Sequence, residues 1–347
     1  MSHPVEPASV LSVSFNQDAS CFSVGTTDGF LVFRAADPFG EALRRNFPGG
    51  IGVVRMLFRC NIFALIGASK SDRNKVRIWD DRLNRGIGEL VFRSEVRAVR
   101  LRTDRIVVVM LHKIYVYSLS DFELIHQIET MENRQGLCEI SKEGQMVLVC
   151  LGEQRGFVRA VQYATNKSTH VMAHSSSIAC VALMDDGMLV ATASTKGTLI
   201  RVFRTADGSL LKEVRRGSDR AVVCSISFSA SGTWLAVSSD KGTVHVFVVK
   251  LDSTSLKTSR SEVPETNKFA PPSSLSRLSF IKGFLPKYFS SEWSVAQFRV
   301  QEGIQHIAAF GPGENTIAVV GSNGSYYRCQ FDPMVGGDMT KLESHNF

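Results

Sequence analysis

A motif that recurs about every forty to forty-five residues constrains the fold of this chain more than any other feature. Each copy has small residues, a polar turn and then alternating apolar residues, most clearly in residues 192–203 and 238–247. The alternation predicts β-strands. Asp-Gly, Lys-Gly and Asn-Gly pairs in the turns favour the positive φ angles of tight hairpins. A repeat of this length is typical of one four-stranded propeller blade.

The repeat predicts an all-β, WD40-like, seven-bladed β-propeller, formed as a single domain by residues 1–347. The last interval, about eighty residues, equals one blade plus an insertion of roughly forty. We expect this insertion to be a long loop, residues 251–292, within the sixth blade. The sequence leaves open whether an N-terminal strand or residues 338–347 complete the last blade.

Net charge limits the class of partner. The formal charge of +7 favours an anionic partner, either nucleic acid or an acidic membrane surface. Lysine and arginine clusters with interleaved aromatic residues, which single-strand binders use, do not stand out, so we expect no nucleic acid. No apolar run approaches the roughly twenty residues of a membrane-spanning helix, and the N-terminus lacks the pattern of a signal peptide.

Motifs of catalysis and metal binding are also missing from the sequence. The seven cysteines occur singly, without zinc-site spacing, and their odd number argues against a disulfide framework. We therefore expect reduced thiols in a cytoplasmic protein without a metal. No nucleophile elbow or phosphate-binding loop appears, so we expect neither an enzyme nor a bound cofactor.

Two adjacent arginines, Arg215 and Arg216, end the predicted outer strand of the fifth blade. Neighbouring strand residues point to opposite faces, so each guanidinium can reach a different recess. Phosphate groups favour guanidinium forks surrounded by hydroxyl and imidazole donors. Such donors flank the arginine strand on both sides: His174, Thr192 and Ser194 before it, and Ser239, Thr243 and His245 after it.

A structural role is the alternative for each of these residues. The arginines can be solvated or paired with Glu213 or Asp219. Threonine and serine residues in propellers often bond to neighbouring blades, and the two histidines can be satisfied within the fold. From spacing alone, the sequence shows that donors can converge in two places.

The chain resembles the PROPPIN family, the WIPI-type propellers of autophagy. Residues 214–217, Val-Arg-Arg-Gly, match the family mark of a hydrophobic residue followed by Arg-Arg-Gly, with valine in place of the usual phenylalanine or leucine. Similar stretches, such as 75–81, 193–201 and 285–294, extend over nearly the whole length, most like the shorter branch that has little beyond the propeller. The resemblance implies binding of phosphatidylinositol 3-phosphate and phosphatidylinositol 3,5-bisphosphate.

The family resemblance places one headgroup site on each side of the arginine strand. It assigns the first site to His174, Thr192, Ser194, Arg201 and Arg215. It assigns the second site to Arg216, Gly217, Ser239, Thr243 and His245, with the glycine allowing close backbone approach. The alternative for Arg201 is an ion pair with an acid on the neighbouring strand.

The inserted loop changes character along its length. Residues 253–276 are rich in Ser, Thr, Lys and Pro and are predicted to be disordered. Apolar pairs then recur at an interval of four, which is typical of a helix that lies in a lipid headgroup layer. In the resembling family the corresponding loop dips into membranes, which assigns membrane insertion to Phe280, Ile281, Phe284 and Leu285. The alternative is that residues 285–289 fold back over the blade.

The function implied by the resemblance is a membrane-recruited scaffold in autophagosome formation. Its expected partners are phosphoinositide-containing membranes and the bridge-like lipid-transfer protein of autophagy. The candidate contact for the latter is the loop 69–74, with Asp72 and Arg73, unless that loop is simply solvated. We expect a monomer, peripherally bound to preautophagosomal, endosomal or vacuolar/lysosomal membranes. The rival interpretation is a protein–protein interaction propeller without lipid recognition.

Overall fold

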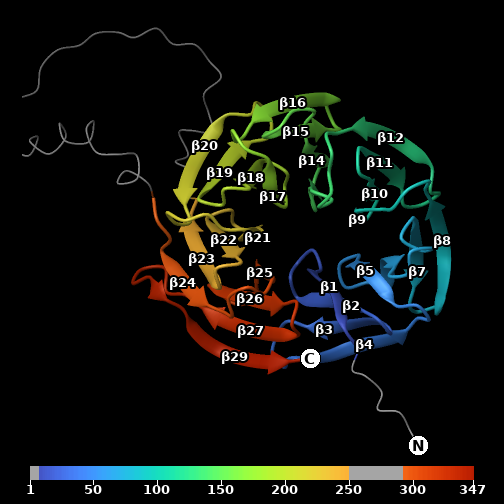
Figure 1. Cartoon of the computed structure of the whole chain (residues 1–347), viewed down its shortest axis with the longest axis horizontal. Helices are drawn as coiled ribbons and strands as arrows, with labels where there is room; N and C mark the ends of the chain where they lie inside the picture. Colours follow the sequence, from blue (N-terminus) through green and yellow to red (C-terminus); the bar gives the residue numbers. More distant parts are fainter. Residues whose placement is uncertain (1–7, 250–291) are drawn as a thin grey trace, which may run out of the picture.

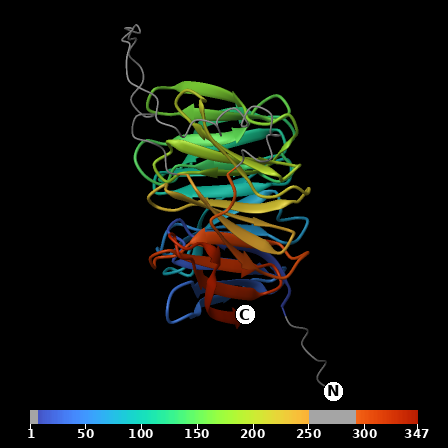
Figure 2. The ribbon, with the colours of Figure 1, turned by 90° about the vertical axis from the view of Figure 1, so that its left-hand side faces the viewer.

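Seven β-sheets, antiparallel except for one short strand, are arranged as blades around a ring in the computed structural model, which describes residues 8–249 and 292–347 (Figure 1). Figure 2 shows the same ring from the side. Strands run in chain order from the centre to the rim, so the innermost strands surround the axis (Figure 1). The predicted seven-bladed all-β propeller is confirmed.

Strands of two to seven residues form the blades. Blade one contains β1 (Val10–Phe15), β2 (Cys21–Thr26), β3 (Gly29–Arg34) and β4 (Gly40–Asn46), and blade two contains β5 (Ile51–Met56), β6 (Ile62–Gly67), β7 (Lys75–Asp80) and β8 (Arg85–Val91). Blade three contains β9 (Ala98–Arg102), β10 (Arg105–Val109), β11 (Lys113–Ser118) and β12 (Leu124–Glu129). Blade four contains β13 (Cys138–Ile140), β14 (Val147–Leu151), β15 (Phe157–Gln162) and β16 (Lys167–Met172). Blade five contains β17 (Ile178–Leu183), β18 (Leu189–Ser194), β19 (Leu199–Arg204) and β20 (Leu210–Arg215). Blades six and seven contain β21 (Val223–Phe228), β22 (Trp234–Ser239), β23 (Thr243–Val248), β24 (Ala296–Arg299) and β28 (Gly337–Asp338), then β25 (His306–Phe310), β26 (Thr316–Gly321), β27 (Ser325–Gln330) and β29 (Thr340–Asn346).

The C-terminal segment completes the last blade. Strand β29 pairs antiparallel with β27, while β1 is the innermost strand of the first blade. Of the two possibilities that the sequence left open, the structure therefore has the second. The short strand β28 lies parallel to β24 and adds a fifth strand to blade six.

Apolar side chains fill the spaces between adjacent blades. Between blades five and six, Ile200, Val202 and Val214 pack in one cluster with Leu235 and Phe247, each at most 1% exposed. Burial of alternate strand residues on such a face stabilises the stack of blades. One face of β20 is therefore fixed against blade six, which determines where its other side chains can point.

Two of the predicted turn glycines lie beside the candidate site. Gly197 and Gly242 both have φ of +65°. A Cβ at Gly197 would meet the carbonyl oxygen of Ala221 at 1.9 Å, so a side chain cannot be accommodated there without backbone movement. The tight turns after β18 and β22 depend on these two positions.

The predicted insertion follows β23 and precedes β24, and its residues 250–291 lie outside the described part of the chain. The four residues assigned to membrane insertion, Phe280, Ile281, Phe284 and Leu285, fall in this range. No helix among the described residues is long and apolar enough to cross a membrane. All seven cysteines are free thiols.

Candidate functional site

The two adjacent arginines diverge at the end of blade five. In the β19–β20 ladder, Arg215 lies opposite Leu199, so it shares the blade face of Arg201 and Glu213. Arg201 donates to the carbonyl oxygen of Ala173 at 2.6 Å, which identifies this face as the one toward blade four. Arg216, just beyond the strand, is only 8% exposed and lies on the side of blade six.

The predicted first site comes together on the face toward blade four. His174 is 5% exposed, and its Nε2 lies 3.0 Å from Thr192 Oγ1. Thr192 lies opposite Arg201 in the β18–β19 ladder, and Ser194 is on the same face two residues on. The backbone N–H of Arg215 donates to the carbonyl oxygen of Glu292 at 2.9 Å. All five residues of this set therefore lie on or against one face of blade five.

Arg201 is paired with an acid, as the structural alternative predicted. Its Nε donates to Glu213 Oε2 at 2.7 Å, and both side chains are partly exposed. A phosphate group at this site would share the guanidinium with Glu213 or displace that carboxylate. Burial, and then the positive charge of Arg201, lower the pKa of His174 to about 4. At neutral pH His174 is therefore an uncharged hydrogen-bonding group.

The predicted second site lies between Arg216 and blade six. Arg216 Nε donates to the carbonyl oxygen of Gly197 at 2.7 Å, and its Nη2 donates to the carbonyl oxygen of Asp219. Neither bond is to a carboxylate, so the alternative of a salt link to Asp219 does not describe this arginine. Burial lowers the pKa of Arg216, while the nearby charges of Asp240 and Asp219 raise it.

Blade six supplies the other donors of this site. Ser239 and Thr243 lie opposite each other in the β22–β23 ladder, and His245 shares the face of Thr243. His245 Nδ1 lies 3.1 Å from Ser294 Oγ. Burial, and then the charge of Arg216, lower the pKa of His245 to about 4. A Cβ built on Gly217 meets nothing within 4 Å, so open space adjoins Arg216.

A buried hydroxyl that lacks a hydrogen-bond partner within the described chain lies in the second site, and another lies beside the first. In the second site it is the Oγ of Ser239, which is 1% exposed. Beside the first site it is the Oγ of Ser176, two residues after His174 and 6% exposed. Buried hydroxyls seldom lack a hydrogen-bond partner, so a ligand or a water molecule is the expected partner of these two serines.

Two residues near these sites were missed from the sequence. Ser176 lies in the run of three serines after His174, and that run was the available signal. Arg299 is exposed and lies opposite Thr243 in the β23–β24 ladder, which places a further cation on the face of His245. Its position could be assigned only once the register of β24 was known.

The two buried histidines make stability depend on pH. Their pKa of about 4 in the folded protein lies below the ordinary value of 6.5, so the unfolded chain binds protons first as the pH falls. We expect full stability above about pH 6.5 and a loss between pH 6.5 and 4, of about 1.4 kcal/mol per pH unit for each histidine. Urea unfolding of the wild type and of His174→Gln and His245→Gln checks this. Equal pH slopes in all three proteins would contradict it.

The family model for PROPPIN matches residues 9–347. The chain belongs to the PROPPIN family. This is a family of autophagy proteins known as phosphoinositide-binding propellers, which act as scaffolds rather than as enzymes. Both arginine-centred sites lie within the matched range. The described residues contain no group of three histidine, cysteine or acidic side chains that could hold a metal ion.

Individual relatives agree with the family assignment. The chain is 41% identical to Autophagy-related protein 18e of Arabidopsis thaliana, over 97% of this chain and 88% of that protein. The crystal structure of Kluyvelomyces marxianus Hsv2 superposes with a TM-score of 0.77 at 26% identity, covering 98% of this chain and 99% of that one. A complex of KlAtg21 with the coiled-coil of AgAtg16 superposes with a TM-score of 0.75 at 25% identity, covering 98% and 99%. These similarities extend over the whole propeller.

Proposed function

We propose that this PROPPIN is a membrane-recruited scaffold in autophagosome formation that binds phosphatidylinositol 3-phosphate and phosphatidylinositol 3,5-bisphosphate at two headgroup sites. The observation that carries the proposal is the divergence of Arg215 and Arg216 onto opposite sides of blade five, each beside a buried neutral histidine and hydroxyl donors. The first site consists of His174, Thr192, Ser194, Arg201 and Arg215, and the second of Arg216, Gly217, Ser239, Thr243 and His245.

The donor sets suit a phosphorylated inositol ring. A guanidinium can bind two phosphate oxygens at once, while hydroxyl groups and neutral imidazole bond to the remaining oxygens and ring hydroxyls. Neutral histidines avoid the cost of adding a second buried charge beside each arginine. Ser239 and Ser176 offer hydroxyls that have no partner within the described chain.

The described chain resumes at Glu292, between the two candidate sites. Glu292 accepts the backbone N–H of Arg215 at 2.9 Å and forms an ion pair with Lys212 at 2.6 Å. Two residues later, Ser294 lies against His245. β20 and β24 belong to neighbouring blades (Figure 1), and a parallel bridge joins Val214 to Glu292. Because the described chain resumes beside both candidate sites, we propose that Phe280, Ile281, Phe284 and Leu285, which precede this point in the sequence, insert into the same membrane.

The described chain has its own apolar tip at this edge. Met334 and Val335 are 91% and 83% exposed. Asp332 Oδ1 accepts both of their N–H groups, at 2.8 and 3.0 Å, so the turn holds the two side chains outward. Gly337 donates to the carbonyl oxygen of Val295 at 2.8 Å, which joins the turn to the start of β24. The turn was missed from the sequence, although two apolar residues between Asp-Pro and Gly-Gly were the available signal.

Removing this apolar tip should weaken membrane binding. For Met334→Ser/Val335→Ser we expect on the order of a tenfold loss of affinity for phosphoinositide vesicles, because apolar surface no longer enters the headgroup layer. Binding of a water-soluble headgroup should not change. The matched control is Leu83→Ser/Ile87→Ser, which removes two exposed apolar residues from blade two. Equal vesicle affinity of the tip variant and the wild type would argue against membrane contact at this turn.

Vesicle flotation tests the proposed function directly. The protein should float with vesicles containing either phosphoinositide and remain in solution with vesicles of uncharged lipids alone. A titration across all phosphoinositides then defines the preference. If flotation is the same with and without phosphoinositide, the propeller is a protein scaffold without lipid recognition.

We also infer a protein partner, because the similar KlAtg21 is known in complex with the coiled-coil of AgAtg16. A cavity of about 560 Å³, lined by Ser69, Arg73, Glu95 and Arg97 among others, opens beside the loop that also contains Asp72. Arg73 is exposed at its edge. We propose that the lipid-transfer protein of autophagy binds at this cavity. The two proteins would meet on preautophagosomal, endosomal or vacuolar/lysosomal membranes. Unchanged co-purification of that protein with an Asp72→Ala/Arg73→Ala variant would exclude this contact.

A further inference from the structure

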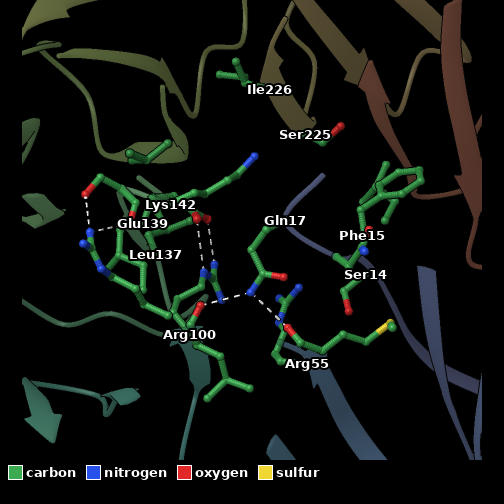
Figure 3. A pocket seen from close by; sticks show the side chains of 18 of the residues that line it. Ser14, Phe15, Gln17, Arg55, Arg100, Leu137, Glu139, Lys142, Ser225 and Ile226 are labelled. Atoms are coloured by element: carbon green, nitrogen blue, oxygen red, sulfur yellow. Dashed lines mark hydrogen bonds and ion pairs between the residues drawn. The ribbon is translucent and has the colours of Figure 1, made fainter. Parts of the chain in front are cut away.

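A cavity of about 310 Å³ lies at the centre of the ring (Figure 3). The innermost strands of all seven blades contribute to its lining, from Val13 of β1 to Ile307 of β25. Among the described lining residues only one, Glu139, is acidic. The basic lining residues are Arg55, Arg100, Arg102 and Lys142.

Three of these four cations have a carboxylate partner. Arg100 forms two hydrogen bonds with Glu139, at 2.8 and 3.2 Å, and Figure 3 shows the two side chains facing each other. Arg102 pairs with Asp104 at 2.8 Å, and Lys142 pairs with Asp185 at 2.6 Å. The positive charges of these three residues are therefore compensated within the fold.

Arg55 differs from the other three. Within residues 8–249 and 292–347 it forms no ion pair, and its buried Nε has no hydrogen-bond partner. Its guanidinium points into the cavity beside Gln17 and on the same side as Arg100 (Figure 3). The Gln17 side-chain oxygen already accepts the backbone N–H of Phe58 at 2.7 Å, and its amide nitrogen donates to two backbone carbonyl oxygens. Gln17 is thus occupied in joining the first three blades.

An uncompensated guanidinium inside the ring is unfavourable. Withdrawing a charge from water is costly unless an opposite charge or full hydrogen bonding replaces the lost hydration. Burial, and then repulsion from Arg100, lower the pKa of Arg55 to about 9, although the negative charge of Glu139, which is paired with Arg100, acts in the opposite direction. The group stays protonated at neutral pH, so a planar cation with free donors faces the cavity.

We propose that the central cavity binds a phosphate-type oxyanion at Arg55, with Arg100 as its neighbour, as a site separate from those at the rim. A guanidinium binds two oxygens of a phosphate group through its parallel N–H donors, and a second guanidinium strengthens the interaction. The anion supplies the negative charge that the fold does not provide at this position. The same chemistry is available from free phosphate, from a soluble phosphate ester and from a lipid headgroup.

Calorimetric titration with inorganic phosphate and with soluble inositol 3-phosphate tests the proposal. The protein used is Arg215→Ala/Arg216→Ala, so that binding at the rim does not contribute. We expect saturable binding at low salt, reduced at least tenfold when Arg55→Met is added. The matched control is Arg85→Met, which removes an exposed arginine from the outer strand of the same blade. Binding of inositol 3-phosphate but not of free phosphate would assign the cavity to a headgroup.

A second variant keeps the test independent of folding defects. Arg55→Glu places a fixed carboxylate beside Arg100, so its melting temperature in phosphate-free buffer should exceed that of the wild type. In the Arg215→Ala/Arg216→Ala background, added phosphate should stabilise the protein that retains Arg55 and leave the melting temperature of the one with Arg55→Glu unchanged. If the rim variant binds neither phosphate nor inositol 3-phosphate, or if binding is equal after Arg55→Met, the central site is overturned. Neither result would affect the rim sites, which are measured with vesicles.

Discussion

Replacing both Arg215 and Arg216 by alanine is expected to abolish flotation with phosphatidylinositol 3-phosphate vesicles, whereas each single replacement weakens it. A site of millimolar affinity contributes only about 4 kcal/mol at a 1 M standard state. Two sites on one rigid ring bind the same membrane with an avidity that can exceed either affinity by about 10² to 10⁴. Loss of one arginine removes the gain in avidity, so binding weakens. Loss of both removes the arginine of the pair from each site, so binding is abolished.

The controls must separate ligand contact from folding. Arg216 bonds to the carbonyl oxygens of Gly197 and Asp219, so its removal leaves the buried Gly197 oxygen without this donor and lowers stability by about 1–3 kcal/mol. Each variant therefore needs a melting curve and a circular dichroism spectrum. Arg82→Ala/Arg85→Ala, which removes two exposed arginines from blade two, is matched in charge. Flotation of a folded Arg215→Ala/Arg216→Ala protein at the wild-type level would refute the two-site proposal.

The fold could be predicted from the sequence because the information is local and repeated. The alternation in residues 189–194 and 198–204 predicted strands that the structure has as β18 and, one residue shorter, β19, and seven copies predicted seven blades. Strand periodicity also determines which side chains share a face, so the divergence of Arg215 from Arg216 was predictable. The strand that completes the last blade was not, because an N-terminal or C-terminal strand satisfies the same pattern.

The partners of the site residues could not be predicted in the same way. An alternating pattern does not show whether Arg201 pairs with Glu213 or remains available, since that depends on side-chain direction within the blade. Contacts between blades join residues far apart in the chain, such as His245 with Ser294 and Arg100 with Glu139. The missing counter-charge of Arg55 becomes visible only when all seven inner strands surround one cavity.

Replacement of Phe22 by alanine should destabilise the whole ring by about 3–5 kcal/mol. Phe22 is fully buried where the first and seventh blades meet. Its ring lies 5.7 Å from that of Tyr326 on β27, 5.2 Å from Phe33 on β3 and 5.2 Å from Phe347 at the C-terminus. Since no strand among residues 8–249 and 292–347 is exchanged between the first and last blades, these contacts and the packing around them must close the ring.

Urea unfolding measures this loss, with Phe22→Leu as the conservative control. Leucine retains most of the buried apolar volume, so its cost should be below about 1.5 kcal/mol. A hydroxyl contact provides a second test of the same junction: Tyr326 donates to the carbonyl oxygen of Ala35 at 2.9 Å. Tyr326→Phe should cost about 1–3 kcal/mol because that buried acceptor loses its donor. If Phe22→Ala costs no more than Phe22→Leu, closure of the ring does not depend on this aromatic cluster, and the remaining strand contacts between the two blades suffice.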